Sequence, residues 1–369
     1  MAGLAERAVL PLDRARSALY RVALGIRPLA RLITLRDRRV ALTASLHALV
    51  AFALTLTVPT LLLVLGPIFL GVPHVVADLR YLVLRRGLPR AWLVAIALGC
   101  AGLVGLRVAQ ELGSDAVRIA RLEYLVVGLW LGAAVIAAVQ RSRRYLRAGL
   151  ALTLIAGASA YAQREPYAVR IAFTHLHNLV ALVLWLYLFR GRLRSALLPL
   201  GLILAFAAVL LSGRTYFVTE RLGSLDLLGL HVLAASDWLA PGFSFYPAAG
   251  LTLSFAFLQS VHYSTWLLVV PQEDVRGQGT VTFAMAARSI QKEFTRLGLV
   301  LILLGLLAVL VGACFDVHRA KNLYLSLAMF HGYLELALGS YFFVRGGLPK
   351  AALDLRLDTP RPAPAVATL

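Results

Sequence analysis

Long apolar stretches alternate with short polar segments along almost the whole chain of 369 residues. Each stretch holds roughly 20 residues, which as a helix can cross a hydrocarbon core of about 30 Å. We predict ten membrane-spanning helices, at residues 40–64, 66–86, 91–110, 119–139, 145–162, 168–189, 195–212, 246–270, 297–315 and 322–344. The pattern predicts an all-α, polytopic integral membrane helix bundle, because a helix satisfies its own backbone hydrogen bonds within lipid.

The charges of the chain fit a membrane protein better than a nucleic-acid-binding one. The formal net charge is +19, but the basic residues lie in the connections between apolar stretches rather than on one soluble domain. With the N-terminus inside, 28 of the 37 Lys and Arg residues fall on the inner side. This bias predicts that both termini are cytoplasmic, in a bacterial-type inner membrane. We therefore expect the lipid bilayer as a partner, and no nucleic acid.

Three segments outside the predicted helices have compositions of their own. Residues 1–39 are basic, and within them 14–36 mix arginine with apolar residues, as in a helix on the inner membrane surface; the alternative is an unstructured basic leader. Residues 222–240 suit an interfacial or re-entrant lid on the outer side. Residues 346–369 end in a Pro- and Ala-rich stretch, and we expect a disordered cytoplasmic tail. The bundle itself spans 40–345.

Several ionisable side chains lie within the predicted helices, where they are costly and mark functional sites. Two helices each carry a histidine four residues before a carboxylate, so that both groups share one face: His74 with Asp78, and His331 with Glu335. Two other helices add His175, His177, Asn178, Gln259, His262 and Tyr263. At about 1.5 Å of rise per residue, these four helices place their polar groups in one layer near the middle of the membrane.

Histidine and carboxylate side chains together favour a transition metal, and two histidines with one carboxylate are typical of non-haem Fe(II). We expect His74, His262, His331 and either His175 or His177 to be metal ligands. Asp78, Glu335, Gln259 and Tyr263 would complete the site as ligands or orienting groups. The two cysteines, Cys100 and Cys314, are far apart in sequence and predict neither a disulfide framework nor a thiolate metal site.

The leading hypothesis is a membrane-embedded, metal-dependent oxidoreductase or oxygenase, with Fe(II) as the favoured metal and a lipid-soluble substrate. Three other uses of the polar layer remain open. Paired histidines could ligate a b-type haem, the buried acids and histidines could form a proton or ion pathway in a transporter, or the polar groups could only lock the helices of a scaffold together. Neither the oligomeric state nor the substrate can be derived from the sequence.

The stretch GVPHVVADLRYL, residues 71–82, resembles the start of the Brp/Blh family of bacterial membrane β-carotene 15,15′-dioxygenases. Gly71, Pro73, His74 and Asp78 match the Gly-x-Pro-His-x-x-x-Asp segment that contributes a metal-binding histidine there. FTHLHN would take the place of that family's next histidine. FAFLQSVHYSTW lies where the family carries a His-Ser-x-x-His pair, but here Gln259 holds the first position and His262 is displaced. The resemblance implies an iron-dependent oxygenase acting on a carotenoid or another isoprenoid.

Overall fold

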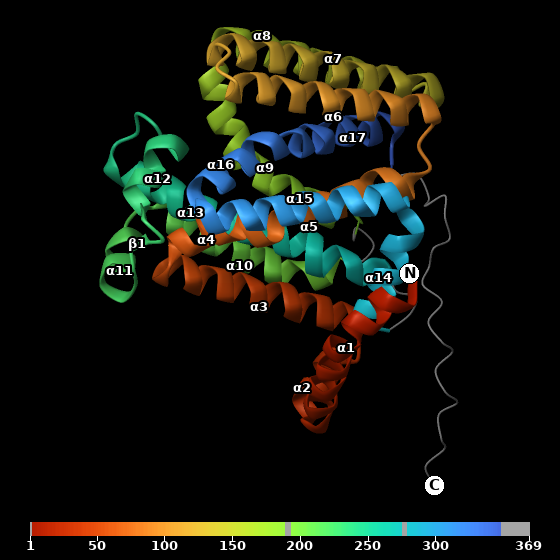
Figure 1. The fold of residues 1–369 in the computed structure, drawn as a ribbon, viewed down its shortest axis with the longest axis vertical. Coiled ribbons are helices and arrows are strands. Elements are labelled where there is room, and N and C mark those ends of the chain that lie inside the picture. The colour runs from red at the N-terminus through yellow and green to blue at the C-terminus, as the bar shows by residue number, and fades with distance from the viewer. Residues whose placement is uncertain (1, 189–192, 275–278, 348–369) are drawn as a thin grey trace.

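A computed structural model of the chain describes residues 2–188, 193–274 and 279–347. The structure is almost entirely helical (Figure 1). Its α-helices are α1 Ala2–Gly25, α2 Arg27–Ile33, α3 Arg36–Thr57, α4 Pro59–Leu65, α5 Gly71–Asp78, α6 Arg90–Glu111, α7 Ala116–Ser142, α8 Tyr145–Arg164, α9 Pro166–Leu188, α10 Leu193–Leu211, α11 Thr215–Leu222, α12 Val232–Leu239, α13 Phe245–Ser264, α14 Phe283–Glu293, α15 Arg296–Phe315, α16 Val317–Ala328 and α17 Phe330–Arg345. Within the described residues, the only strands are β1 Asp226–Leu227 and β2 Leu230–His231, an antiparallel pair.

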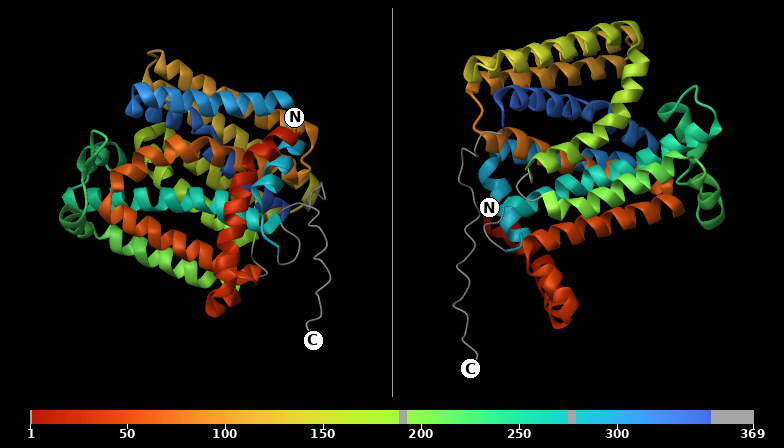
Figure 2. Two further views of the ribbon diagram at one scale, coloured as in Figure 1. Left: turned by 60° about the horizontal axis from the view of Figure 1, so that its bottom comes forward. Right: turned by 180° about the vertical axis from the view of Figure 1, so that it is seen from behind.

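The helices form two packed groups, and the histidines and carboxylates predicted to form the site lie between these groups. On one side α6, α7, α8 and α17 pack together, and on the other α3 packs against α10 and α13 (Figures 1 and 2). Each group has its own apolar core, centred on Trp130 and Leu338 in the first and on Trp185 and Phe257 in the second. Helix α9 contacts both α8 and α13 and so joins the two groups.

Nine helical segments of the described residues are long and apolar enough to cross a membrane. They correspond to nine of the ten predicted spans, which confirms an all-α bundle of the multi-pass membrane type. The remaining predicted span, 145–162, is the 20-residue helix α8, which packs along α7 but is less apolar. The count of ten and the cytoplasmic placement of the termini stay predictions.

One predicted boundary is wrong. The first span was predicted to end at residue 64, whereas α3 ends at Thr57 and a second span runs from Pro59 to Arg86. Pro59 ends α3 because proline has no amide hydrogen and its ring clashes with the preceding turn. Pro67 does not break the second span, because a π-helical turn, Gly66–Leu70, accommodates it.

The segments outside the spans are mostly helical as well. The basic N-terminal segment forms α1 and α2, and α1 packs against α14. Residues 222–240 form the end of α11, the small hairpin and α12 rather than a membrane span. Several helices begin at a side-chain cap, such as Asp115 on α7 and Asp316 on α16. The predicted disordered tail lies mostly outside the described residues.

Glu293 fastens α14 to the end of the second span. Its carboxylate lies 2.6 Å from Arg80 Nε and 2.5 Å from Arg85 Nη2, and it accepts a hydrogen bond from Ser289 Oγ. Burial alone would raise the pKa of Glu293, but hydrogen bonds and charge from Arg85 and Arg80 outweigh it and hold the pKa below its ordinary value of 4.5. The contact is therefore an ion pair at neutral pH.

We expect acid to weaken this attachment. A carboxyl whose pKa is lower in the folded state stabilises the fold fully above its unfolded pKa, and the contribution disappears as the pH falls through the folded value. The thermal unfolding midpoint of the detergent-purified protein should thus fall between about pH 5 and pH 3. Glu293→Gln should show a shallower fall over this range, with a lower midpoint at pH 7. An unchanged pH profile in Glu293→Gln would contradict the assignment.

Candidate metal centre

Four histidines from four helical segments converge between the two helix groups. His74 lies on α5, His177 on α9, His262 on α13 and His331 on α17. Ring-centroid distances between neighbouring members run from 4.6 Å for His177–His262 to 6.4 Å for His262–His331. Imidazoles from four helices therefore lie close together in the structure. We call His74, His177, His262 and His331 the histidine cluster.

Local features of the helices let these rings approach each other. A π-helical turn precedes α5, and another, Thr265–Val269, follows α13; such turns often occur at functional sites. Gly332, next to His331, has no side chain, and a Cβ there would lie 2.9 Å from His177 Nδ1. Gly71 leaves room for the ring of Tyr324, with which a Cβ would collide. The glycine of the GVPH motif therefore has a steric role beside the histidine.

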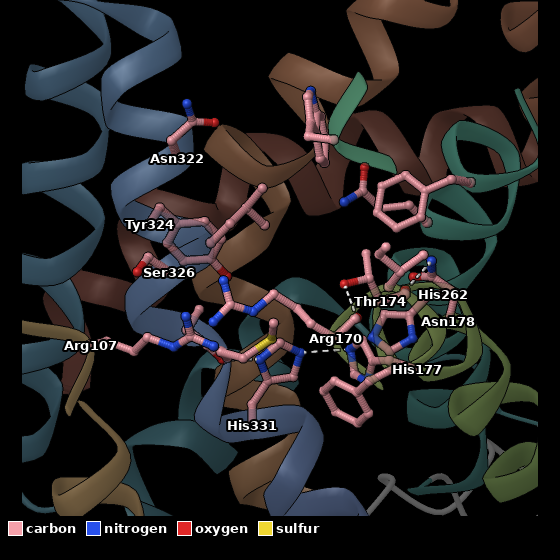
Figure 3. Close-up of a pocket in the computed structure, with 18 of the residues that line it drawn as sticks. Arg107, Arg170, Thr174, His177, Asn178, His262, Asn322, Tyr324, Ser326 and His331 are labelled. Carbon is pink, nitrogen blue, oxygen red and sulfur yellow. Dashed lines mark hydrogen bonds between the residues drawn. The ribbon is translucent and has the colours of Figure 1, made fainter. Parts of the chain in front are cut away.

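The ring nitrogens meet at distances suited to shared coordination. His331 Nε2 lies 3.0 Å from His74 Nε2. It also lies 2.9 Å from His177 Nε2, the contact drawn as a dashed line in Figure 3. One ring nitrogen from each of His74, His262 and His331 lies within 4.8 Å of the others. These three histidines are buried. They can hold a metal ion.

Hydrogen bonds on the far side of the rings fix which nitrogens carry protons. His74 Nδ1 donates to the Leu70 carbonyl at 3.3 Å, and His331 Nδ1 donates to the Ala328 carbonyl at the end of α16. A neutral imidazole that carries its proton on Nδ1 has a bare lone pair on Nε2. The Nε2 atoms of His74 and His331 therefore face each other as two acceptors, an arrangement that a cation between them would stabilise.

Glu335 supports the cluster from the next turn of α17. Its Oε2 atom lies 3.2 Å from His177 Nδ1, and its Oε1 atom accepts a hydrogen bond from Trp266 Nε1 at 3.1 Å. A carboxylate behind the non-coordinating nitrogen is the usual outer partner of a metal-binding histidine. Glu335 Oε2 and His177 Nδ1 form no hydrogen bond in this structure, so the contact is electrostatic, and on the other side of the ring His177 Nε2 lies 2.9 Å from His331 Nε2.

Asp78 is placed differently from Glu335. Its carboxyl group is fully buried, and neither oxygen has a hydrogen-bond partner within the described part of the chain. A buried carboxylate without a partner is strongly unfavourable. The group therefore needs a proton or a cation in the working protein.

A cavity of about 670 Å³ adjoins the histidine cluster. This volume is within the usual range for small-molecule sites, about 300–1,000 Å³. All four cluster histidines line it, together with aromatic side chains such as Phe173 and Phe255, and Trp238 and Pro241 from the region of the predicted lid form part of its wall. A second, more apolar pocket of about 270 Å³ lies among α7, α8, α9 and α17 and shares Phe173 with the first.

The other predicted site residues separate into two groups. Gln259 and Tyr263 line the cavity, and the Tyr263 ring lies 4.6 Å from the His74 ring. Asn178 also lines it. His175 lies outside the histidine cluster: its Nε2 atom is 2.9 Å from the Leu239 carbonyl, and its ring packs against Phe255. His175 and His177 were the two alternatives on α9, and only His177 belongs to the cluster. Residues two positions apart on a helix point in different directions, so both could not face the same site.

Sequence reasoning missed the basic wall of the cavity. Arg107 pairs with Glu123, whose carboxylate also accepts a hydrogen bond from the Tyr333 hydroxyl at 2.6 Å. Arg170 lines the same cavity. These residues lie near the ends of the predicted spans, where basic residues were counted for topology alone. One signal in the sequence could have placed Arg170 beside the site. Thr174 and His177 follow it at i+4 and i+7, so all three residues share one face of a helix.

In comparisons with known proteins, the chain matches no protein-family model, no curated protein and no solved structure.

Proposed function

We propose that the protein is a membrane-embedded, iron-dependent oxygenase that acts on an unsaturated, lipid-soluble substrate such as an isoprenoid. The observation that carries the proposal is the buried triad of His74, His262 and His331, whose ring nitrogens lie within 4.8 Å of one another beside a cavity. His331 Nε2 also makes two short nitrogen–nitrogen contacts, with His74 and with His177. A proton shared between two nitrogens can remove the lone-pair repulsion in only one of these contacts, either His331–His74 or His331–His177. A metal ion relieves both, because each nitrogen then donates its lone pair to it.

Imidazole nitrogens are ligands that suit iron, zinc, copper and nickel. The proposal takes iron because activation of O₂ needs a redox-active ion, and Zn²⁺ has no redox chemistry.

The residues of the chain divide the work of such a reaction. A bound iron ion supplies the activation of O₂. His74, His177, His262 and His331 would hold it, with the Glu335 carboxylate 3.2 Å from His177 Nδ1. Phe173, Tyr263 and Phe255 surround the apolar part of the substrate and exclude water. Cleavage of one carbon–carbon double bond by O₂ places one oxygen atom on each carbonyl product, so that no further reductant is needed.

A second candidate function is proton-coupled transport, and the unpartnered carboxyl group of Asp78 favours it. A buried acid that alternates between protonated and ionised forms is a common component of proton pathways. Ion-dependent flux into proteoliposomes that disappears in Asp78→Asn would support transport. The histidine cluster, in contrast, has its nitrogens directed at each other rather than along a path.

Substrate-dependent O₂ consumption tests the proposed reaction. We expect the purified full-length protein, supplied with Fe(II) and an unsaturated isoprenoid in detergent, to consume O₂ and release carbonyl products detectable by mass spectrometry. His262→Gln should lose at least about 100-fold of this rate, in the range for removal of a catalytic interaction. His175→Gln, on the neighbouring face of α9, should retain it. Equal rates in the two variants would contradict the proposal.

A further inference from the structure

The cavity beside the histidine cluster contains a cation without a counter-ion. Arg170, on the first turns of α9, lines the cavity, and its Nε and Nη2 atoms are buried with no hydrogen-bond partner within the described residues. Its guanidinium group stacks over the ring of Tyr167, with 5.8 Å between the Cζ atom and the ring centroid. A cation–π contact stabilises the charge but satisfies none of its N–H donors.

Other donors of the cavity wall point to the same kind of ligand. The Tyr324 hydroxyl and Arg107 Nε are also buried without partners, and in Figure 3 the side chains of Arg107 and Arg170 extend into the cavity from opposite sides of the view. The charge of Arg107 is balanced by Glu123, whereas Arg170 forms no ion pair with a carboxylate in the described part of the chain. Glu111 also lines the cavity, yet it is solvent-exposed and forms no ion pair with Arg170.

We propose that this part of the cavity binds an acidic group, a carboxylate or a phosphate monoester, at one end of an apolar substrate. The proposal rests on the proposed function for the reaction of the substrate's apolar part at the histidine cluster. Arg170 presents a planar fork of N–H donors, which matches the two oxygens of such a group. The substrate class is thus an unsaturated chain with an acidic end group rather than a neutral hydrocarbon.

The helix sets the position of the acidic group relative to the histidine cluster. Arg170, Thr174 and His177 follow each other at i, i+4 and i+7 on one face of α9, and all three line the cavity. Arg170 and His177 are therefore two helical turns apart, about 10 Å along the axis. Phe173 and Met329 lie on the cavity wall with them and contact an apolar chain favourably. Only substrate atoms about two helical turns from the acidic group would reach the histidines.

Matched pairs of acids and alcohols test the proposal. The probes are oleate with oleyl alcohol, and farnesyl phosphate with farnesol, and their equilibrium binding to the full-length protein is measured in one detergent. We expect each acid to bind about 10- to 100-fold more tightly than its alcohol, as expected for charge-assisted hydrogen bonds. The larger ratio identifies the preferred acid, carboxylate or phosphate.

Arg170→Met should abolish the preference for the acids and leave the affinity for the alcohols unchanged. Arg170→Lys keeps the charge without the fork and should retain part of the preference. Arg164→Met is the matched control, because Arg164 is exposed at the end of the neighbouring α8; it should behave as the wild type. The thermal unfolding midpoint of Arg170→Met should change little, since the substitution loses the cation–π contact with Tyr167 but removes the two buried groups, Nε and Nη2, that have no hydrogen-bond partner among the described residues.

Equal binding of acid and alcohol to the wild type would overturn the proposal, since the arginine would then be hydrated by water in the cavity. An acid preference that survives in Arg170→Met would overturn it as well. Metal content is measured in the same preparations. Bound metal without an acid preference would refute only this inference, and an acid preference without metal would refute only the proposed function.

Discussion

Replacing His331 with alanine is expected to remove the metal from the purified protein. His331 Nε2 contacts the Nε2 atoms of both His74 and His177, so its loss separates the other ligands from one another. Losing an outer partner of a metal ligand weakens binding by about 10- to 100-fold, and losing the central ligand should exceed this. Elemental analysis after chelator-free purification should find about one metal ion per wild-type chain, as expected for a single shared site, and almost none in His331→Ala.

His175→Ala provides the matched control for this experiment. His175 lies on the same helix as His177, but it contacts the Leu239 carbonyl instead of the histidine cluster. The His175→Ala protein should keep its metal. Addition of the metal should raise the thermal unfolding midpoint of the wild type and of His175→Ala but not that of His331→Ala, because only a bound ligand stabilises the folded state. Equal metal content in all three proteins would show that the histidine cluster is not the site.

Breaking the buried ion pair between α6 and α7 is expected to give the largest loss of stability. Arg107 Nη2 lies 2.7 Å from Glu123 Oε2, and both side chains are less than a tenth exposed. Removing one partner of a buried pair leaves an uncompensated charge and costs about 3–5 kcal/mol. Arg107→Met should therefore lower the free energy of unfolding by about this amount. Unfolding of the protein in mixed micelles by a denaturing detergent provides the measurement.

The double variant distinguishes an unpaired charge from lost packing. Glu123→Gln removes the charge of the carboxylate while its oxygen still accepts the Tyr333 hydrogen bond. In Arg107→Met/Glu123→Gln no buried charge remains, and most of the lost stability should return. Glu111→Gln, at the exposed end of α6, is the control and should change little. If the losses of the two single variants simply add, the ion pair does not act as a unit.

The sequence contained enough information to find most of the histidine cluster. The i, i+4 pairs His74–Asp78 and His331–Glu335 could be assigned to faces of single helices, and the rise per residue placed them at similar depth. What the sequence could not give was the rotation of one helix relative to another. For this reason His175 and His177 could not be distinguished, and Asp78 and Glu335, although equivalent in sequence, have different surroundings.

Features that depend on irregular backbone or on the ends of helices could not be predicted from the sequence either. Pro59 and Pro67 are both prolines in apolar runs, yet one ends a helix and the other lies in a π-helical turn. Arg107 and Arg170 were counted as topology signals, and their contribution to the cavity became visible only when α6, α9 and α16 were brought together.

The interruption between α16 and α17 has a consequence for the chemistry of His331. The carbonyl of Ala328, in the last turn of α16, receives the Nδ1 proton of His331. In the last turn of a helix, carbonyls lack their usual intrahelical donors, so the break supplies an acceptor where an unbroken helix through residues 317–345 would supply none. The ring would then be free to place its proton on either nitrogen. A repair of the break, which would strengthen the helix, would thus leave the histidine cluster without a fixed set of donor atoms.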